Sequence, residues 1–247
     1  MTESGHFVTL AGVSKRFGDN EVLHGIDLSI DLHQVVCLIG ASGSGKSTLL
    51  RCLNLLEDID DGVIEFEGRE ISDPRIDRRE VRSRMGMVFQ AYNLFPHLTV
   101  LDNCTLAPRK VHGVSKKEAE DRARGLLAQF GLADQADKHP DRMSGGQQQR
   151  AALVRALCTQ PTLLLLDEIT AALDPELVGD VLTIVRDLAE QGTTMILATH
   201  EMSFARDIAT TVCFLDQGRI LEQGPPAEIF SNPREDRTRQ FLARVLG

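Results

Sequence analysis

The segment GASGSGKS, Gly40–Ser47, follows the apolar run Gln34–Ile39 and precedes the helix-prone sequence STLLRCLNLLE. It matches the phosphate-loop pattern G-x-x-x-x-G-K-[ST] in the strand-to-helix context that this pattern requires. Its glycines let backbone N–H groups point at phosphate oxygens. Lys46 reaches the β- and γ-phosphates, and the hydroxyl of Ser47 binds Mg²⁺. A glycine-rich turn without a ligand does not account for both flanks. We therefore expect a nucleoside triphosphate site made of Gly40, Ala41, Ser42, Gly43, Ser44, Gly45, Lys46, Ser47 and Thr48.

The sequence around this loop predicts an α/β fold. Residues 1–70 are rich in Val, Ile and Phe and are punctuated by Gly, Asp and Asn, which favours a small antiparallel sheet wrapped around the buried strand Gln34–Ile39. Further along, helices capped by Ser115, Ser144 and Asp174 alternate with the apolar strands Leu163–Asp167 and Thr194–Thr199. Such alternation predicts a parallel sheet covered on both faces, with ligands at the carboxyl ends of its strands.

Two adjacent carboxylates end the buried strand Leu163–Asp167. Acidic residues at a strand end are often helix caps, but here they accompany a phosphate loop. Asp167 is predicted to hold Mg²⁺, directly or through water, and Glu168 to orient the attacking water or act as its general base. Together with Lys46, these residues predict a hydrolytic site.

Two further polar residues end strand-like segments and are expected at the same sheet edge. His200 follows Thr194–Thr199 and is predicted to contact the γ-phosphate and hold the water. Gln90 follows Met85–Phe89 and is predicted to reach Mg²⁺ or the water, although alone it carries little weight. The other six histidines are interpreted as ordinary turn residues.

The segment MSGGQ, Met143–Gln147, carries two glycines in the first turn of a predicted helix. Ser144 and Gln147 have capping-box spacing, which explains them without a ligand. Gly145 and Gly146 weaken a helix unless its backbone must approach something closely. We interpret this helix start as a second phosphate site.

Composition narrows the class of protein. The 247 residues carry a net charge of −9, which opposes binding to nucleic acid, and the N-terminal sequence lacks a secretion signal. Five cysteines without metal-ligand spacing indicate reduced core residues, and no apolar run is long enough to span a membrane. The basic run Pro74–Arg84 is predicted to be a solvated helical face, with contact to anionic lipid or a partner loop as the alternative.

In this order, GASGSGKS, Gln90, MSGGQQQR, LLLLDE, LDPE and His200 resemble the ATP-binding subunits of ABC transporters over nearly the whole chain. The resemblance implies a P-loop NTPase with a RecA-like parallel core and an N-terminal antiparallel β subdomain, together at 1–90 and 156–247, and a helical subdomain at about 91–155. All belong to one ATP-binding domain, 1–247. It also implies a dimer, with homodimer expected, in which each ATP lies between the loop of one subunit and Ser144–Gln147 of the other.

The resemblance assigns further roles. Phe17 stands where the family stacks an aromatic ring on adenine, and Asp174 belongs to a loop that crosses the dimer interface. Gln90 begins the loop that senses two transmembrane permease subunits, and the helical segment after it docks on them. The cofactors are ATP and Mg²⁺, and the expected location is peripheral, on the cytoplasmic face of the cell membrane.

Four stretches, including FQAYNLFPHLTVLDN and THEMSFARDIA, are similar to bacterial polar amino-acid importers and their relatives for compatible solutes. Importers also work with an extracytoplasmic solute-binding protein. The alternatives are an exporter or lipoprotein-release ATPase and a soluble ABC-type ATPase acting on nucleic acid or ribosomes. No nucleic acid partner is expected.

Three positions depart from the family pattern. Met143 replaces Leu, a mild change of apolar shape. Ile169 replaces Pro after Glu168, and Ala171 replaces a Ser next to the dimer interface. These changes bear on the rate and coupling of hydrolysis.

Overall fold

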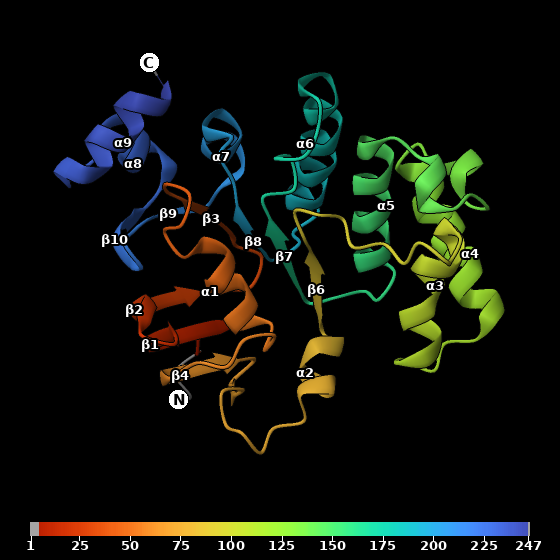
Figure 1. Cartoon of the computed structure of the whole chain (residues 1–247), viewed down its shortest axis with the longest axis horizontal. Coiled ribbons are helices and arrows are strands. Elements are labelled where there is room, and N and C mark those ends of the chain that lie inside the picture. Colours follow the sequence, from red (N-terminus) through yellow and green to blue (C-terminus); the bar gives the residue numbers. More distant parts are fainter. Residues whose placement is uncertain (1–4, 247) are drawn as a thin grey trace.

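The computed structural model describes residues 5–246, whose ten strands form two sheets (Figure 1). The larger sheet has the strand order β10-β9-β3-β8-β7-β6. All its neighbours are parallel except β10, which pairs antiparallel with β9. The strands are β3 (Val35–Ile39), β6 (Met85–Val88), β7 (Leu163–Asp167), β8 (Met195–Ala198), β9 (Thr211–Asp216) and β10 (Arg219–Gly224). The predicted parallel core is confirmed.

The smaller sheet is antiparallel, with the order β2-β1-β4-β5. Its strands are β1 (Val8–Phe17), β2 (Asn20–Ile30), β4 (Asp61–Phe66) and β5 (Arg69–Glu70). The prediction that this sheet wraps around Gln34–Ile39 was wrong in one respect. The apolar strand β3 hydrogen-bonds to β8 and β9 in the parallel sheet, because a strand without polar alternation needs apolar cover on both faces.

Alternating side chains of the parallel strands enter two separate cores. In β3, Val35, Cys37 and Ile39 pack with the helices of one core, whereas Val36 and Leu38 pack with the antiparallel sheet and the helix after the phosphate loop. The same alternation runs through β7, β8 and β9. Both faces of the sheet are therefore covered, as the unbroken apolar runs predict.

The helices begin where the sequence places caps. Ser115 and Ser144 each accept a hydrogen bond from the backbone three residues on, and Ser144 forms a full capping box. Asp174 occupies the N-cap position of its helix, but its side chain makes no capping hydrogen bond, which corrects its predicted role as a cap. The α-helices are α1 (Lys46–Leu53), α2 (Arg78–Ser83), α3 (Val100–Lys110), α4 (Lys116–Gln129), α5 (Gly145–Leu157), α6 (Pro175–Glu190), α7 (Met202–Ile208), α8 (Pro226–Ser231) and α9 (Asp236–Leu246). Two 3-10 turns, Ala133–Gln135 and Pro140–Arg142, precede α5.

Helices α3, α4 and α5 form a group at one side of the molecule, beyond β6 (Figure 1). They contact one another, and α5 also contacts β6 and α6. The chain therefore leaves the sheet after β6 and returns through α5 to β7.

The basic run Pro74–Arg84 is only partly a helical face, because α2 begins at Arg78. Arg75, Arg78 and Arg84 pair with the acidic residues Asp73, Asp58 and Glu67. All five cysteines are buried and free, as expected. Among residues 5–246, no helix is both long and apolar enough to cross a membrane.

Candidate functional site

The strand register gathers four predicted site residues at one edge of the parallel sheet. Leu38 of β3 lies opposite Ala198 of β8, which in turn lies opposite Asp167 of β7. Leu166 of β7 lies opposite Val88 of β6. The positions just beyond these aligned residues are Gly40, Gln90, Glu168 and His200. Hydrogen bonding across the sheet therefore delivers residues from distant parts of the sequence to one place.

Two glycines of the phosphate loop occupy positions that no other residue fits. Gly40 has a φ of 149°, and a Cβ there would lie 2.1 Å from the carbonyl oxygen of Leu215. Gly45 has a φ of 107° at the N-cap of α1, where a Cβ would lie 2.8 Å from the side chain of Leu23. Both values of φ lie in the region that favours glycine. The loop is thus held tightly against its surroundings, with its backbone turned toward the start of α1.

Two polar groups of this loop are buried, one without a partner in residues 5–246 and one held by carbonyl oxygens of the loop. The Ser44 hydroxyl is buried and has no hydrogen-bond partner among the described residues. The ammonium of Lys46, whose residue is 3% exposed, donates to the carbonyl oxygens of Gly40 at 3.0 Å and Ala41 at 3.1 Å. A buried cation and an unpaired hydroxyl beside the N-terminus of α1 suit an anionic phosphate chain. The remaining predicted members, Ser42, Gly43 and Thr48, continue the loop into α1.

Ser47 and Asp167 meet at the end of β7. The Ser47 hydroxyl donates to Oδ1 of Asp167 at 2.6 Å. Burial raises the pKa of Asp167, and the hydrogen bond from Ser47 opposes that shift. Two oxygens side by side are the kind of ligand that Mg²⁺ prefers, so the donor set fits a magnesium ion.

Glu168 is the centre of the charged cluster. Its Oε1 lies 2.9 Å from Nε2 of His200 and 3.4 Å from Nζ of Lys46. Glu168 also has a φ of 46°, an uncommon value for a residue other than glycine. The carboxylate, imidazole and ammonium thus converge as the sequence predicts, beside the phosphate loop.

Gln90 and Phe17 are not tied to this cluster. Gln90 is exposed at the end of β6, and its side chain makes no hydrogen bond among the described residues. Phe17 ends β1 with 46% of its surface exposed, and Nζ of Lys15 lies 5.0 Å from its ring centroid. An exposed ring is free to stack on a planar ligand.

The segment Ser144–Gln147 does not contact the phosphate loop of its own chain through any hydrogen bond or ion pair described in residues 5–246. Its helix α5 lies on the far side of β6 and β7 from α1 (Figure 1). A Cβ on Gly145 would lie 3.1 Å from the Tyr92 hydroxyl, and one on Gly146 would lie 3.0 Å from Leu177. Close packing within the chain therefore accounts for both glycines, which weakens the inference of an anion site from glycine alone.

Residues 23–171 match the ABC transporter family. The chain belongs to this family. It is 49% identical to the glutamine transport ATP-binding protein GlnQ of Bacillus subtilis (strain 168), over 97% of this chain and 99% of the relative. It is also 49% identical to the L-cystine import ATP-binding protein TcyC of the same organism, over 97% of this chain and 98% of the relative.

Solved ABC structures share the fold. The dimeric post-hydrolysis state of the ATP-binding cassette MJ0796 bound to ADP and Pi has a TM-score of 0.81 and 31% identity, covering 89% of this chain and 98% of that one. The structure of cbiO1 from Clostridium perfringens, part of the ABC transporter complex cbiONQ, has a TM-score of 0.82 and 27% identity, covering 98% of each chain. The ABC protein described here is therefore an ATP-binding and ATP-hydrolysing, energy-coupling subunit of an ABC importer.

Two parts of this ABC subunit escaped the sequence interpretation. The β9–β10 hairpin supports the phosphate loop from behind, because the Gly218 N–H donates to the Ser44 carbonyl at 3.1 Å. The Asp-Gln-Gly sequence at its turn, between two apolar runs, is the hairpin signal that could have revealed it. Tyr92 lies in the stretch that resembles amino-acid importers, but its contacts with the loop of Ala172 and with the start of α5 were not predicted.

Proposed function

We propose that this ABC subunit powers the import of a polar amino acid or a related solute. The observation that carries this proposal is its similarity, along nearly the whole chain, to relatives named for glutamine transport and L-cystine import. The site supports the ATPase part of the proposal, because Glu168 lies within reach of His200 and Lys46 at the mouth of the phosphate loop.

In this proposal, residues Gly40–Thr48 bind the phosphates of ATP, with Lys46 contacting the β- and γ-phosphates. Glu168 accepts a hydrogen bond from the attacking water and takes its proton, while His200 holds the γ-phosphate and the water in line. Mg²⁺, when bound, neutralises phosphate charge, and Ser47, Asp167 and Gln90 would hold it. The orphaned Ser44 hydroxyl and the adjacent Ser47 and Asp167 oxygens support this assignment.

A second copy of the subunit completes each site. Ser144–Gln147 of one subunit contacts the ATP bound in the phosphate loop of the other, Phe17 stacks on the adenine, and the exposed Asp174 crosses the interface. The separation of Ser144–Gln147 from the phosphate loop within one chain supports a shared site, and so does the dimeric state of the similar cassette MJ0796. The Asp174 carboxylate makes no capping hydrogen bond to its own helix, so it is available to a partner subunit.

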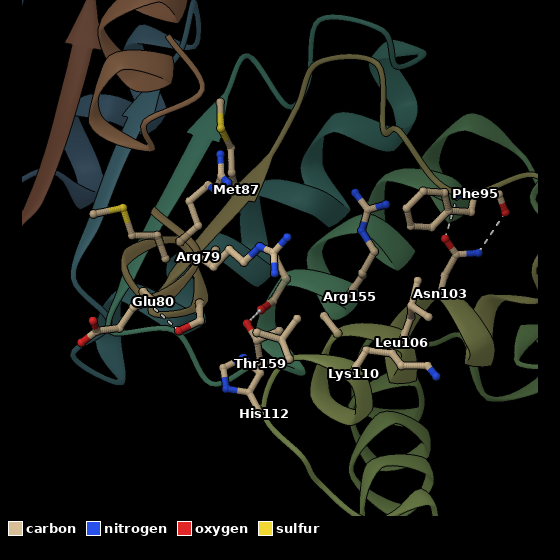
Figure 2. Close-up of a pocket in the computed structure, with 17 residues that line it drawn as sticks. Arg79, Glu80, Met87, Phe95, Asn103, Leu106, Lys110, His112, Arg155 and Thr159 are labelled. Atoms are coloured by element: carbon tan, nitrogen blue, oxygen red, sulfur yellow. Dashed lines mark hydrogen bonds between the residues drawn. The ribbon is translucent and has the colours of Figure 1, made fainter. Parts of the chain in front are cut away.

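The helical region at about 91–155 is proposed to dock on two transmembrane permease subunits at the cytoplasmic face of the membrane. A groove of about 920 Å³ opens between α2, β6 and the helices α3 and α5. Figure 2 shows Arg79, Lys110 and Arg155 around it, with Phe95 at one side. The solute itself is delivered by an extracytoplasmic binding protein and does not touch this subunit.

The groove carries positive charge that is available for contact with the permease subunits. Arg79, Arg82 and Lys110 line it without an ion pair among the described residues, whereas Glu80 is engaged by Arg69 at 2.8 Å. We expect the double change Arg79→Glu and Arg82→Glu to reduce co-purification with the permeases by roughly tenfold or more. Each reversal removes an attraction to acidic groups of the permease and puts a repulsion of like charges in its place.

The control keeps the same net charge. Arg75→Glu combined with Arg244→Glu reverses two exposed arginines outside the groove and outside residues 91–155, and this variant should retain the complex. Equal loss of the complex in both variants would show that the groove is not the contact.

The transport proposal is tested by assembling the subunit with its two transmembrane permease subunits in lipid vesicles, with the binding protein outside and ATP on the side that carries the subunit. Uptake of polar amino acids should depend on ATP and should saturate. Export from the vesicles, or ATP turnover that no amino acid stimulates, would contradict the proposal.

A further inference from the structure

Three loops of the site meet at a single side chain, Tyr92. Its hydroxyl donates to the carbonyl oxygen of Ala172 at 3.0 Å. That carbonyl belongs to the loop between Glu168 and Asp174. The same hydroxyl faces Gly145, where a Cβ would lie 3.1 Å away, closer than ordinary contact. Tyr92 therefore bridges the loop after Gln90, the loop after Glu168 and the first turn of α5.

The backbone that carries this side chain is held in an unusual conformation. Tyr92 and Asn93 have φ values of 58° and 51°, which bulky side chains rarely adopt. Arg155 of α5 donates to both of their carbonyl oxygens. Consecutive residues of this kind persist only where the surroundings determine them strongly, and such sites are often functional. The direction of the phenol ring is thus set by α5.

The same arginine also lines the groove in Figure 2. Arg155 therefore contacts the backbone of Tyr92 and the groove surface at once. The Ala172 carbonyl, in turn, lies two residues before Asp174. A chain of direct contacts runs from the groove through Arg155 and Tyr92 to the loop of Asp174.

We propose that Tyr92 is a positioning residue for ATP hydrolysis. Its hydroxyl holds the loop between Glu168 and Asp174 at a set place relative to the first turn of α5, so that Asp174 and Ser144–Gln147 meet the second subunit together. This inference rests on the proposed roles of those residues in the dimer. It also explains why residue 145 is a glycine, because a side chain at this position would displace the Tyr92 hydroxyl.

The test is Tyr92→Phe in the otherwise unchanged chain, which removes one hydroxyl and keeps the ring. We expect the kcat for ATP to fall by about two- to tenfold, the range for losing one neutral hydrogen bond. The KM for ATP should change less than about twofold, because Tyr92 is not among the residues proposed to bind the nucleotide. An unchanged kcat, or a rise in KM alone, would overturn the proposal.

Thr183→Val is the matched control. The Thr183 hydroxyl also donates to a backbone carbonyl, that of Gly179 at 2.9 Å, but within α6 and away from the three loops. Its removal should leave kcat within about twofold. A drop in kcat equal to that of Tyr92→Phe would mean that any such bond matters, and would count against a positioning role. If the wild-type chain neither bound nor hydrolysed ATP, the proposed function itself would fail, whichever way Tyr92→Phe behaved.

Discussion

Glu168→Gln is expected to abolish ATP turnover while preserving ATP binding, and to trap the subunit as a dimer around uncleaved nucleotide. The amide keeps the shape of the side chain but cannot accept the proton of the attacking water. General-base assistance is worth about 10²- to 10⁴-fold in rate. Phosphate release in a single turnover measures the rate, and size-exclusion chromatography with ATP and Mg²⁺ measures the dimer.

The geometry explains why this carboxylate should act as the base. Glu168 Oε1 contacts both His200 and Lys46, the two residues that are predicted to contact the γ-phosphate. Glu201 provides the control, because it follows the neighbouring strand but has no ion pair among residues 5–246. Glu201→Gln should hydrolyse ATP at the wild-type rate. Normal turnover by Glu168→Gln would show that another group activates the water.

Lys46→Met is expected to weaken ATP binding by about 10- to 100-fold, because hydrogen bonds to charged groups contribute roughly 1.5–3 kcal/mol each. The Lys46 side chain is 3% exposed, and among residues 5–246 it reaches loop carbonyls and Glu168. Its ammonium is thus directed into the loop and available to phosphate oxygens. Isothermal titration calorimetry with ATP measures the loss.

The position of the phosphates makes this prediction specific. AMP lacks the β- and γ-phosphates, so Lys46→Met should affect AMP binding much less than ATP binding. Lys116→Met, which removes an exposed lysine from α4, should change neither. Equal losses for AMP and ATP, or a large fall in melting temperature, would indicate that Lys46 supports the fold instead of contacting the distal phosphates.

The phosphate loop could be predicted from sequence because all its determinants lie close together in the chain. The apolar strand, the glycines with positive φ and the start of α1 fall within residues 34–53. The acidic strand end and His200 could be predicted for a related reason. Parallel strands place their carboxyl ends at one edge, so apolar runs ending in polar residues indicate a shared site.

The contacts of Asp174, Gly145 and Gly146 could not be predicted in the same way. Asp174 has the residue type and spacing of a cap, yet its carboxylate makes no capping bond. Gly145 and Gly146 suggested an approaching phosphate, but the tertiary structure places Tyr92 and Leu177 against them. A glycine in a helix indicates that another group packs closely against the backbone, but the sequence does not identify that group.

By itself, then, the sequence determined the parallel core, the phosphate loop and the charged strand ends, since these depend on local conformation and on hydrophobic periodicity. The tertiary structure alone decided which partners those residues meet. It placed the β9–β10 hairpin behind the loop, with Gly218 bonded to Ser44, and it joined Tyr92 to Ala172 across 80 positions of the chain. Such contacts arise from the packing of whole elements, and no short stretch of sequence encodes them.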